Sequence, residues 1–546
     1  MNAKKSQNKM IIAVIVAAII VISGLYYLAV TLPTEPEKKE EEKEKEIIDK
    51  ISPLTTQAVF LEIHRVRKKG IIDVMMKSGS DFFVNLLTPK DIKIDSAKDY
   101  TKLSAIQALE GLRPGKGWDQ KPSYKYFAVI DGFEFESRQT YKKWDTGYIN
   151  QQIFRKVQEE QETTEVELKI IENKVVKKII GSSTTKKEME SFKVIYDFRT
   201  GRWKGDDYFN DSDGYGHYNG SNYEIWFTLH QTSADRDDIP WWVEVNVLGT
   251  DPTVDDSKLD PDEDGIPTEW EWKWGYDPNT FDNHSDLDPD QDGLQNDEEY
   301  FLTEWLANPY HQEIYIEADY MEKTPKKLFN RDGFDGWEHE FYEESQQMII
   351  ERFNEHGITV HIDDGRMGEG GDLLPFDKGT GVFTQEKGVV AGFYNNNFAD
   401  ERKGSFRYVM VLYGGGWCHP QDSNHFYDCI AVPHNRKFYI NAIGYALTDR
   451  TKRIGQAVQV LHELGHSLGM NRANNPGIDN TSLREGNSGS DYPWFDYISA
   501  MNYDYFYLRY FDYSDGSHGE NDVNDWSRID LTFFQKPAKR MEGLSD

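Results

Sequence analysis

The chain has 546 residues, which is too long for one compact core, so we expect several structural units. Its 94 acidic side chains exceed its 62 Lys and Arg side chains and give a net charge of −32, which argues against binding to nucleic acid. Hydrophobic residues make up 38% of the chain, which excludes disorder throughout, and two cysteines exclude a disulfide-rich scaffold or a four-thiolate zinc site.

Residues 10–32 form an uncharged, largely apolar stretch that would span about 34 Å as a helix, close to the thickness of a bilayer core. Lys4, Lys5 and Lys9 precede it and a Glu-rich tract follows, so the positive-inside rule places the N-terminus in the cytoplasm. The length of the run favours an uncleaved anchor over a cleaved signal peptide. The sequence therefore predicts a single-pass protein of the cell membrane with a cytoplasmic tail (1–9), a transmembrane anchor (10–32), a charged stalk (33–50) and extracellular domains after them.

Residues 51–230 contain no catalytic motif. Alternating apolar and polar residues over 126–135, 165–180 and 192–198 predict strands, and Gly, Asn and Asp residues between them predict turns. We therefore expect a β-rich domain, whose role the sequence does not indicate.

Residues 231–310 carry most of the excess negative charge: 23 Asp and Glu against three basic residues lie between positions 233 and 310. Two segments in it have the pattern D-x-D-x-D-G followed by Glu at loop position 12. This is the spacing at which alternate side chains of a tight loop, closed by a bidentate Glu, surround a calcium ion. The predicted calcium ligands are Asp260, Asp262, Asp264 and Glu271 in the first loop, and Asp288, Asp290, Asp292 and Glu299 in the second.

A third, weaker copy of the loop holds Asp235, Asp237 and Glu244, with Ser233 in place of the first Asp and Asp238 in place of the Gly. A Gly-x-Asp-Pro or Ala-Asn-Pro segment follows each closing Glu, so the period is near 27 residues. These residues resemble thrombospondin type 3 and related calcium repeats, which implies short loops that fold around their ions. An acidic linker would explain the charge but not the fixed spacing.

The segment His462 to Gly469 reads HELGHSLG and lies where apolar residues recur at helical spacing, between Arg453 and Leu468. Two His residues four positions apart share one face of a helix, so His462 and His466 can both reach one zinc ion. The adjacent Glu463 can then act as a general base toward water. The motif indicates metal-assisted hydrolysis.

With this motif, the turn Ser499–Tyr503 (SAMNY), which contains Met501, resembles the metzincin metalloproteases. The resemblance implies an α+β protease domain at 311–546, a Met-turn beneath the zinc, and a catalytic role for Tyr503. The chain departs from the family where the third zinc ligand is expected, because that position is Arg472. We take Asp479 as the leading substitute, ahead of Glu485, Asp491 and Asp496.

Strands expected at 313–320, 358–362 and 406–413 would form the sheet of this domain, and its edge strand would pair with an extended substrate. Cys418 and Cys429 enclose a loop that also contains two His residues. Outside the cell a disulfide between them is favoured over a second metal site.

Taken together, the sequence predicts a multidomain, membrane-anchored extracellular zinc endopeptidase that calcium stabilises, with Zn²⁺ and Ca²⁺ as cofactors. Its partners would be a peptide or protein substrate and the membrane, not nucleic acid, and the sequence does not indicate an oligomeric state. The alternative is a calcium-dependent surface binding or adhesion protein with an incomplete zinc site. Arg472 favours that alternative, whereas the intact His462, Glu463 and His466 favour the enzyme.

Overall fold

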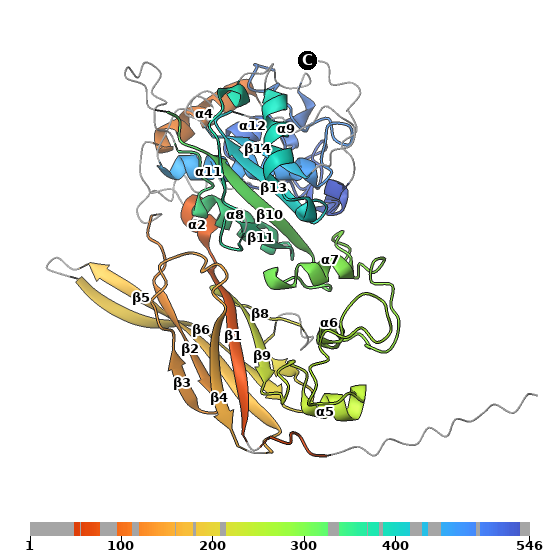
Figure 1. Ribbon diagram of the computed structural model, residues 1–546. Helices are drawn as coiled ribbons and strands as arrows, with labels where there is room; N and C mark the ends of the chain where they lie inside the picture. The colour runs from red at the N-terminus through yellow and green to blue at the C-terminus, as the bar shows by residue number, and fades with distance from the viewer. Residues whose placement is uncertain are drawn as a thin grey trace, which may run out of the picture. The chain divides into compact units, whose positions relative to one another are not determined.

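A computed structural model shows how the chain folds (Figure 1). It describes residues 49–54, 56–76, 96–111, 119–158, 160–177, 182–207, 214–325, 338–368, 370–381, 386–414, 428–434, 449–487 and 492–535. Its strands form three sheets.

Two of the sheets are antiparallel and share one core. One has the order β4 (Gln151–Val157), β1 (Gln57–Lys68), β9 (Tyr223–Gln231), β8 (Gly216–Asn219). The other has the order β3 (Phe133–Glu136), β2 (Tyr124–Ile130), β5 (Thr163–Lys177), β6 (Ser182–Asp197), β7 (Trp203–Gly205). Apolar side chains from β1, β2, β5, β6 and β9 pack in a single cluster, as in a β-sandwich. The stretches expected at 165–180 and 192–198 fall mainly in β5 and β6, whereas the stretch 126–135 forms two strands, β2 and β3, joined by a turn at 131–132.

The segment between β1 and β2 does not belong to this sandwich core. Ile71 and Met75 of α2 (Ile71–Met76) lie in the core that surrounds α8 and α11, described below. Tyr100 of α4 (Ala97–Gly111) packs with Leu483 and Tyr492. Part of the stretch expected to be β-rich thus completes the C-terminal region.

The acidic segment consists of loops and short helices. The helices are α5 (Trp241–Val243), η2 (Glu244–Leu248), α6 (Thr268–Trp274), α7 (Asn296–Phe301) and η3 (Thr303–Trp305). Trp270 and Trp274 of α6 pack with Tyr215 and Trp226 of the sandwich region, so an apolar cluster anchors the charged loops.

The C-terminal sheet is parallel in all its described pairings. Its order is β11 (Thr359–Asp363), β10 (Glu313–Met321), β13 (Phe406–Leu412), β14 (Cys429–Pro433), and β12 (Leu373–Leu374) also pairs with β10. One face packs on α8 (Glu343–Asn354) and α11 (Asp449–Ser467), and the other on α9 (Glu386–Asn397) (Figure 1). The remaining described helices are short: η4 (Lys378–Gly381), η5 (Asp400–Arg402), η7 (Pro493–Asp496), α12 (Tyr503–Tyr507), η8 (Trp526–Arg528) and η9 (Phe533–Gln535).

This arrangement corrects the predicted fold class. The α+β domain expected from the metzincin resemblance is instead a parallel sheet covered by helices on both faces, within a chain of mixed α/β content. The physical reason is visible in β10 and β13, whose residues are buried on both faces almost without exception. Continuous burial of this kind is typical of parallel strands.

The structure also corrects the predicted membrane topology. Within the described residues, no helix combines the length and the apolar composition needed to cross a bilayer. α11 spans 19 residues, but charged side chains such as Asp449, Lys452 and Glu463 interrupt it. The predicted anchor at 10–32 and most of the stalk at 33–50 lie outside the described residues. The predicted transmembrane helix and the membrane localisation with extracellular domains therefore have no support in the described residues.

The predicted disulfide between Cys418 and Cys429 is not among the contacts of the described residues. Cys429 begins β14, whereas Cys418 lies outside the described residues, so no disulfide joins two described cysteines.

Candidate functional site

Helix α11 presents two imidazoles in fixed orientations. Its apolar face packs on α8 and β14, which leaves His462 and His466 on the side toward the turn that precedes α12. Nδ1 of His462 lies 2.9 Å from the carbonyl oxygen of Ala500, and Nδ1 of His466 lies 2.7 Å from that of Met470. A carbonyl accepts only from a protonated nitrogen, so both Nε2 atoms are left free to bind a cation.

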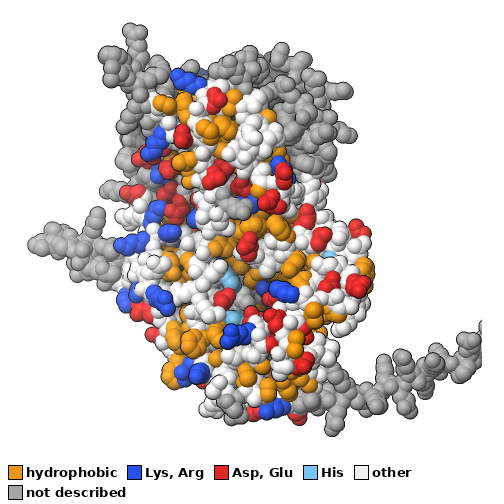
Figure 2. Space-filling view, in the orientation of Figure 1, with side chains coloured by type: hydrophobic (Ala, Val, Ile, Leu, Met, Phe, Trp, Pro, Cys, Tyr) orange, Lys and Arg blue, Asp and Glu red, His pale blue; other side chains and the backbone are white. Residues whose placement is uncertain are grey.

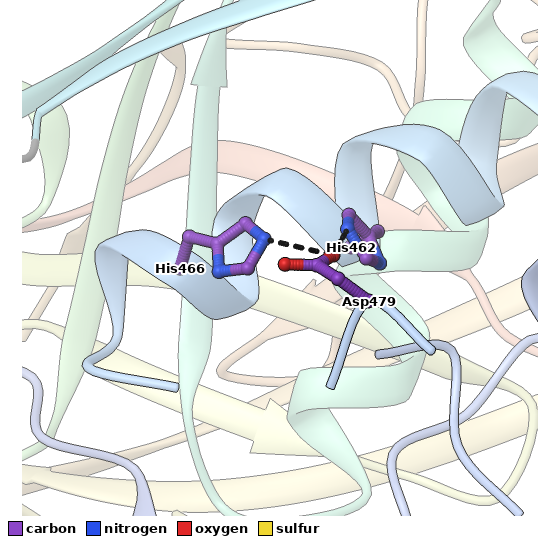
Figure 3. Close-up of side chains that lie close together, drawn as sticks. All are labelled: His462, His466 and Asp479. Atoms are coloured by element: carbon purple, nitrogen blue, oxygen red, sulfur yellow. Dashed lines mark ion pairs between the residues drawn. The ribbon is translucent and has the colours of Figure 1, made fainter. Parts of the chain in front are cut away.

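Asp479 lies between the two imidazoles (Figure 3). Its Oδ1 is 3.1 Å from Nε2 of His462 and 3.7 Å from Nε2 of His466. Its backbone has φ of 58° and its N–H donates to the carbonyl of Met501 at 2.9 Å, which fixes the carboxylate there. Nε2 of His462 and Oδ1 of Asp479 are buried without a hydrogen-bond partner. Two imidazoles and a carboxylate therefore converge on one point, which is a donor set suited to zinc.

The charges at this point interact strongly. Burial would raise the pKa of Asp479, but His466 and His462 outweigh burial and hold it well below its usual range. Burial likewise opposes the charged form of His466, yet Asp479 raises the pKa of that imidazole to about 9. A divalent cation bound here would replace the proton that the pair otherwise holds.

Glu463 and Tyr503 lie beside the three donors. Burial raises the pKa of Glu463, and the nearby His462 and His466 partly oppose this rise. The ring of Tyr503 stacks on His462 with 4.9 Å between centroids. Burial, followed by the charges of Asp479 and Glu463, raises the pKa of Tyr503 well above its usual value. Tyr503 therefore keeps its phenolic proton and can donate a hydrogen bond.

Further contacts hold the turn that contains the predicted Met501 beneath the site. Met501 is fully buried, and a Cβ added at Gly465 would lie 2.4 Å from its Sδ, so a larger residue there would force the Met501 side chain to shift. Ser499 donates to Asp525 and accepts from the N–H of Met501. The Asn502 side chain caps α12 by accepting from the N–H of Asp504, a role that Asn at a helix start could have suggested.

The other candidates for the third ligand lie elsewhere. Arg472 is exposed, as is Glu485, whose carboxylate accepts from Thr481. Asp496 is the last residue of η7. Its Oδ2 lies next to Gly519, where it would meet an added Cβ. Asp491 lies outside the described residues. Among the described candidates, Asp479 is the one beside both imidazoles.

The first two acidic loops share one backbone conformation. Gly265 and Gly293 have φ of 101° and 95°, in the region that favours glycine. Their N–H groups donate to the first Asp of each loop, at 2.9 Å to Asp260 and 3.1 Å to Asp288. Several acidic side chains of this segment are exposed (Figure 2), but those at the closing positions, Glu271 and Glu299, are buried.

The second loop crowds like charges together. Burial and the neighbouring carboxylates raise the pKa of Asp290 to about 9 and that of Asp292 to about 7. Burial raises the pKa of Glu299 well above its usual value, and Glu313 of β10 adds most to this among the neighbouring charges. Both carboxylate oxygens of Glu299 and one each of Asp288 and Asp290 are buried without a hydrogen-bond partner. A divalent cation would satisfy these oxygens.

The third loop is more complete than its sequence indicates. Asp235, Asp237 and Glu244 bring carboxylate oxygens within 4.8 Å of one another. Burial and these neighbours, together with Asp256, raise the pKa of Glu244 to about 9. Asp256 was missed because it follows the closing Glu, outside the loop pattern.

Comparisons with known proteins do not identify the chain. No protein-family model and no curated protein matches it. Human GIVD cytosolic phospholipase A2, solved in complex with methyl gamma-linolenyl fluorophosphonate, is similar over 32% of this chain and 17% of its own length, with 10% identity and a TM-score of 0.15. A Drosophila C2-DSL-EGF1 structure is similar over 32% of this chain and 68% of its own, with 7% identity and a TM-score of 0.14. Similarities this low support neither a fold nor a function.

Proposed function

We propose that the protein is a zinc-dependent hydrolase of peptide bonds. The observation that carries this proposal is the convergence of three donors: Nε2 of His462, Nε2 of His466 and Oδ1 of Asp479. The carboxylate of Glu463 lies next to them but is not one of the three donors. Catalytic zinc sites combine three protein ligands with one open position. Asp479 thus supplies the ligand that Arg472 cannot.

Each side chain has a role that follows from its position. Bound zinc would supply Lewis acidity, which polarises a substrate carbonyl and makes water more acidic. Glu463, adjacent to the first ligand, accepts the proton of the attacking water and can return it to the departing amine. Tyr503 keeps its phenolic proton and can donate to the developing oxyanion.

We further propose that calcium ions occupy the second and third acidic loops and stabilise this part of the chain. The N–H of Glu313, the first residue of β10, donates to Asp292 of the second loop at 2.8 Å. Ordering of the loop by an ion would therefore order the start of the sheet that supports α11.

A calcium-dependent binding protein without catalysis is the second candidate. The buried, unpartnered carboxylates of the acidic loops favour it, because they require a cation but no reaction. It does not explain why Glu463 stands beside three converging donors.

Glu463→Gln tests the proposed reaction. The exposed Glu485→Gln provides a matched control, because it removes the same charge from the same region. Zinc content and hydrolysis of azocasein are measured for the wild type and for both variants. We expect one zinc per α11 site in all three, and a loss of activity of about 10²–10⁴-fold only in Glu463→Gln. Zinc-free or inactive wild-type protein would instead favour the binding protein.

A further inference from the structure

The first acidic loop contains a feature that the second does not. His284, which follows α6 in the chain, is 1% exposed and reaches back into the first loop. Its Nε2 lies 3.1 Å from Oδ2 of Asp264 and 3.8 Å from Oε1 of Glu271. A nitrogen donor therefore faces two carboxylates that the calcium pattern predicts to be ligands.

Oδ2 of Asp264 accepts a hydrogen bond from the N–H of Asp282 at 3.2 Å, whereas the atoms that face it lack such partners. Nε2 of His284 and both carboxylate oxygens of Glu271 are buried without a hydrogen-bond partner. Two donors that each lie about 2.1 Å from one ion are separated by about 3.0–3.8 Å at ordinary coordination angles. The distances of 3.1 and 3.8 Å fit that range and closely match the 3.1 and 3.7 Å between Asp479 and the two imidazoles of α11.

We propose that His284, Asp264 and Glu271 form a second metal centre, which binds a divalent transition metal of the zinc and manganese class and not calcium. Calcium takes oxygen ligands, whereas an imidazole nitrogen suits first-row transition metals. The equivalent neighbour of the second loop is the carboxylate of Glu313, so that loop has oxygen ligands only. The proposal goes beyond the peptidase function and does not depend on the α11 centre.

The far side of the imidazole is built to hold it in place. The amide of Asn296 contacts Nδ1 of His284 and the hydroxyl of Tyr276, each at 2.9 Å, while the other end of that amide is buried without a partner. With the two amide ends exchanged, Oδ1 accepts from both Nδ1–H and the hydroxyl, which leaves Nε2 free for a metal. In the opposite amide orientation His284 would only donate to Asp264 and orient a calcium ligand.

Cobalt binding distinguishes these two roles. The full chain carries His462→Ala, which removes the α11 centre, and is stripped of metal and then saturated with calcium to fill the oxygen-only loops. Co²⁺ binding is measured by equilibrium dialysis, and imidazole coordination by X-ray absorption at the cobalt edge. We expect one Co²⁺ that calcium does not displace and whose spectrum shows an imidazole ligand.

The variants test the ligand set. His284→Ala and Glu271→Gln should each lower the affinity for this Co²⁺ ion more than about 100-fold. A residue that only positions a ligand typically accounts for a 10- to 100-fold loss of affinity. Asp290→Asn, the matched change in the second loop, should leave Co²⁺ binding unchanged. Displacement of Co²⁺ by calcium, or a cobalt spectrum without imidazole scattering, would overturn the proposal. This spectrum is recorded on the His462→Ala protein, so the test does not require the His284 variant to fold. Because the α11 centre is removed in every sample, failure here leaves the proposed peptidase function untouched.

Discussion

The α11 centre and the second acidic loop both gather groups that can bind a cation, but they are held in place differently. In the α11 centre, hydrogen bonds from Nδ1 to backbone carbonyls fix both imidazoles, so the donors are placed by the fold itself. In the second loop, carboxylates such as Asp290 and Glu299 are buried against one another. Under the proposed function, the first arrangement would use its ion for chemistry, and the second would use its ion for stability.

Removal of calcium should therefore have the largest effect on folding. Occupancy of a site at 100 times its dissociation constant contributes about 2.7 kcal/mol, so calcium in the second and third loops contributes about 5 kcal/mol. We expect melting curves of the full chain in EGTA to lie well below those in calcium. Superimposable curves at moderate salt would refute calcium binding by Asp288–Glu299 and by the third loop, and would remove the contrast with α11.

Asp479→Asn should have the next largest effect, on metal binding and not on folding. Loss of one of three ligands should weaken zinc binding by more than about 100-fold, which corresponds to about 2.7 kcal/mol, and activity should fall with it. The melting temperature in calcium should change little, because the imidazoles keep their own anchors. Glu485→Gln is the control, and full zinc occupancy in Asp479→Asn would show that another residue is the third ligand.

Gly465→Ala should destabilise the base of the α11 centre. The added Cβ would lie 2.4 Å from Sδ of Met501, and overpacking of this kind costs about 1–3 kcal/mol. We expect a lower free energy of unfolding in urea and weaker zinc binding. Gly388→Ala in α9 is the matched control, because nothing lies within 4 Å of its added Cβ and alanine favours a helix. Equal stability of both variants would mean that the Met501 turn shifts easily.

The sequence predicted the local parts of both regions. The helical period and the spacing of His462 and His466 located α11, and the acidic spacing located both loops, because the chemistry lies within one turn or one loop. It did not predict contacts made over long distances in the chain. His284 reaches the first loop from 13 residues beyond Glu271, and Glu313 borders the second loop from the strand that follows it. Neither position follows from a local sequence pattern.

The direction of the strands was missed for a related reason. The expected strands at 313–320, 358–362 and 406–413 correspond to β10, β11 and β13. The connections that contain α8 and α9 make these strands parallel, because a helical crossover returns the chain to the same end of the sheet. The resemblance of a short motif to metzincins carried no information on those connections.

Glu313→Gln should have the smallest effect and separates charge from shape at the second loop. The Glu313 side chain accepts from the hydroxyl of Tyr315 at 2.8 Å and pairs with Nε2 of His361 at 3.0 Å, and a glutamine oxygen can keep one of these contacts. Among the neighbouring charges, however, that of Glu313 makes the largest contribution to the raised pKa of Glu299.

Without calcium, the neutral side chain should relieve repulsion and raise the free energy of unfolding, but by less than a pair of full charges would, because burial raises the pKa of Glu313 itself well above its usual value. With calcium bound, the same change removes a favourable charge near the ion, so the gain in stability from calcium should shrink. Urea titrations in EGTA and in calcium measure both values, and Glu304→Gln, an exposed acid of the same segment, is the control. An equal loss of stability in both conditions would show that Glu313 acts only as a hydrogen-bond acceptor. It would also show that the stability of the second loop does not depend on a bound ion, although its crowded carboxylates imply that it does.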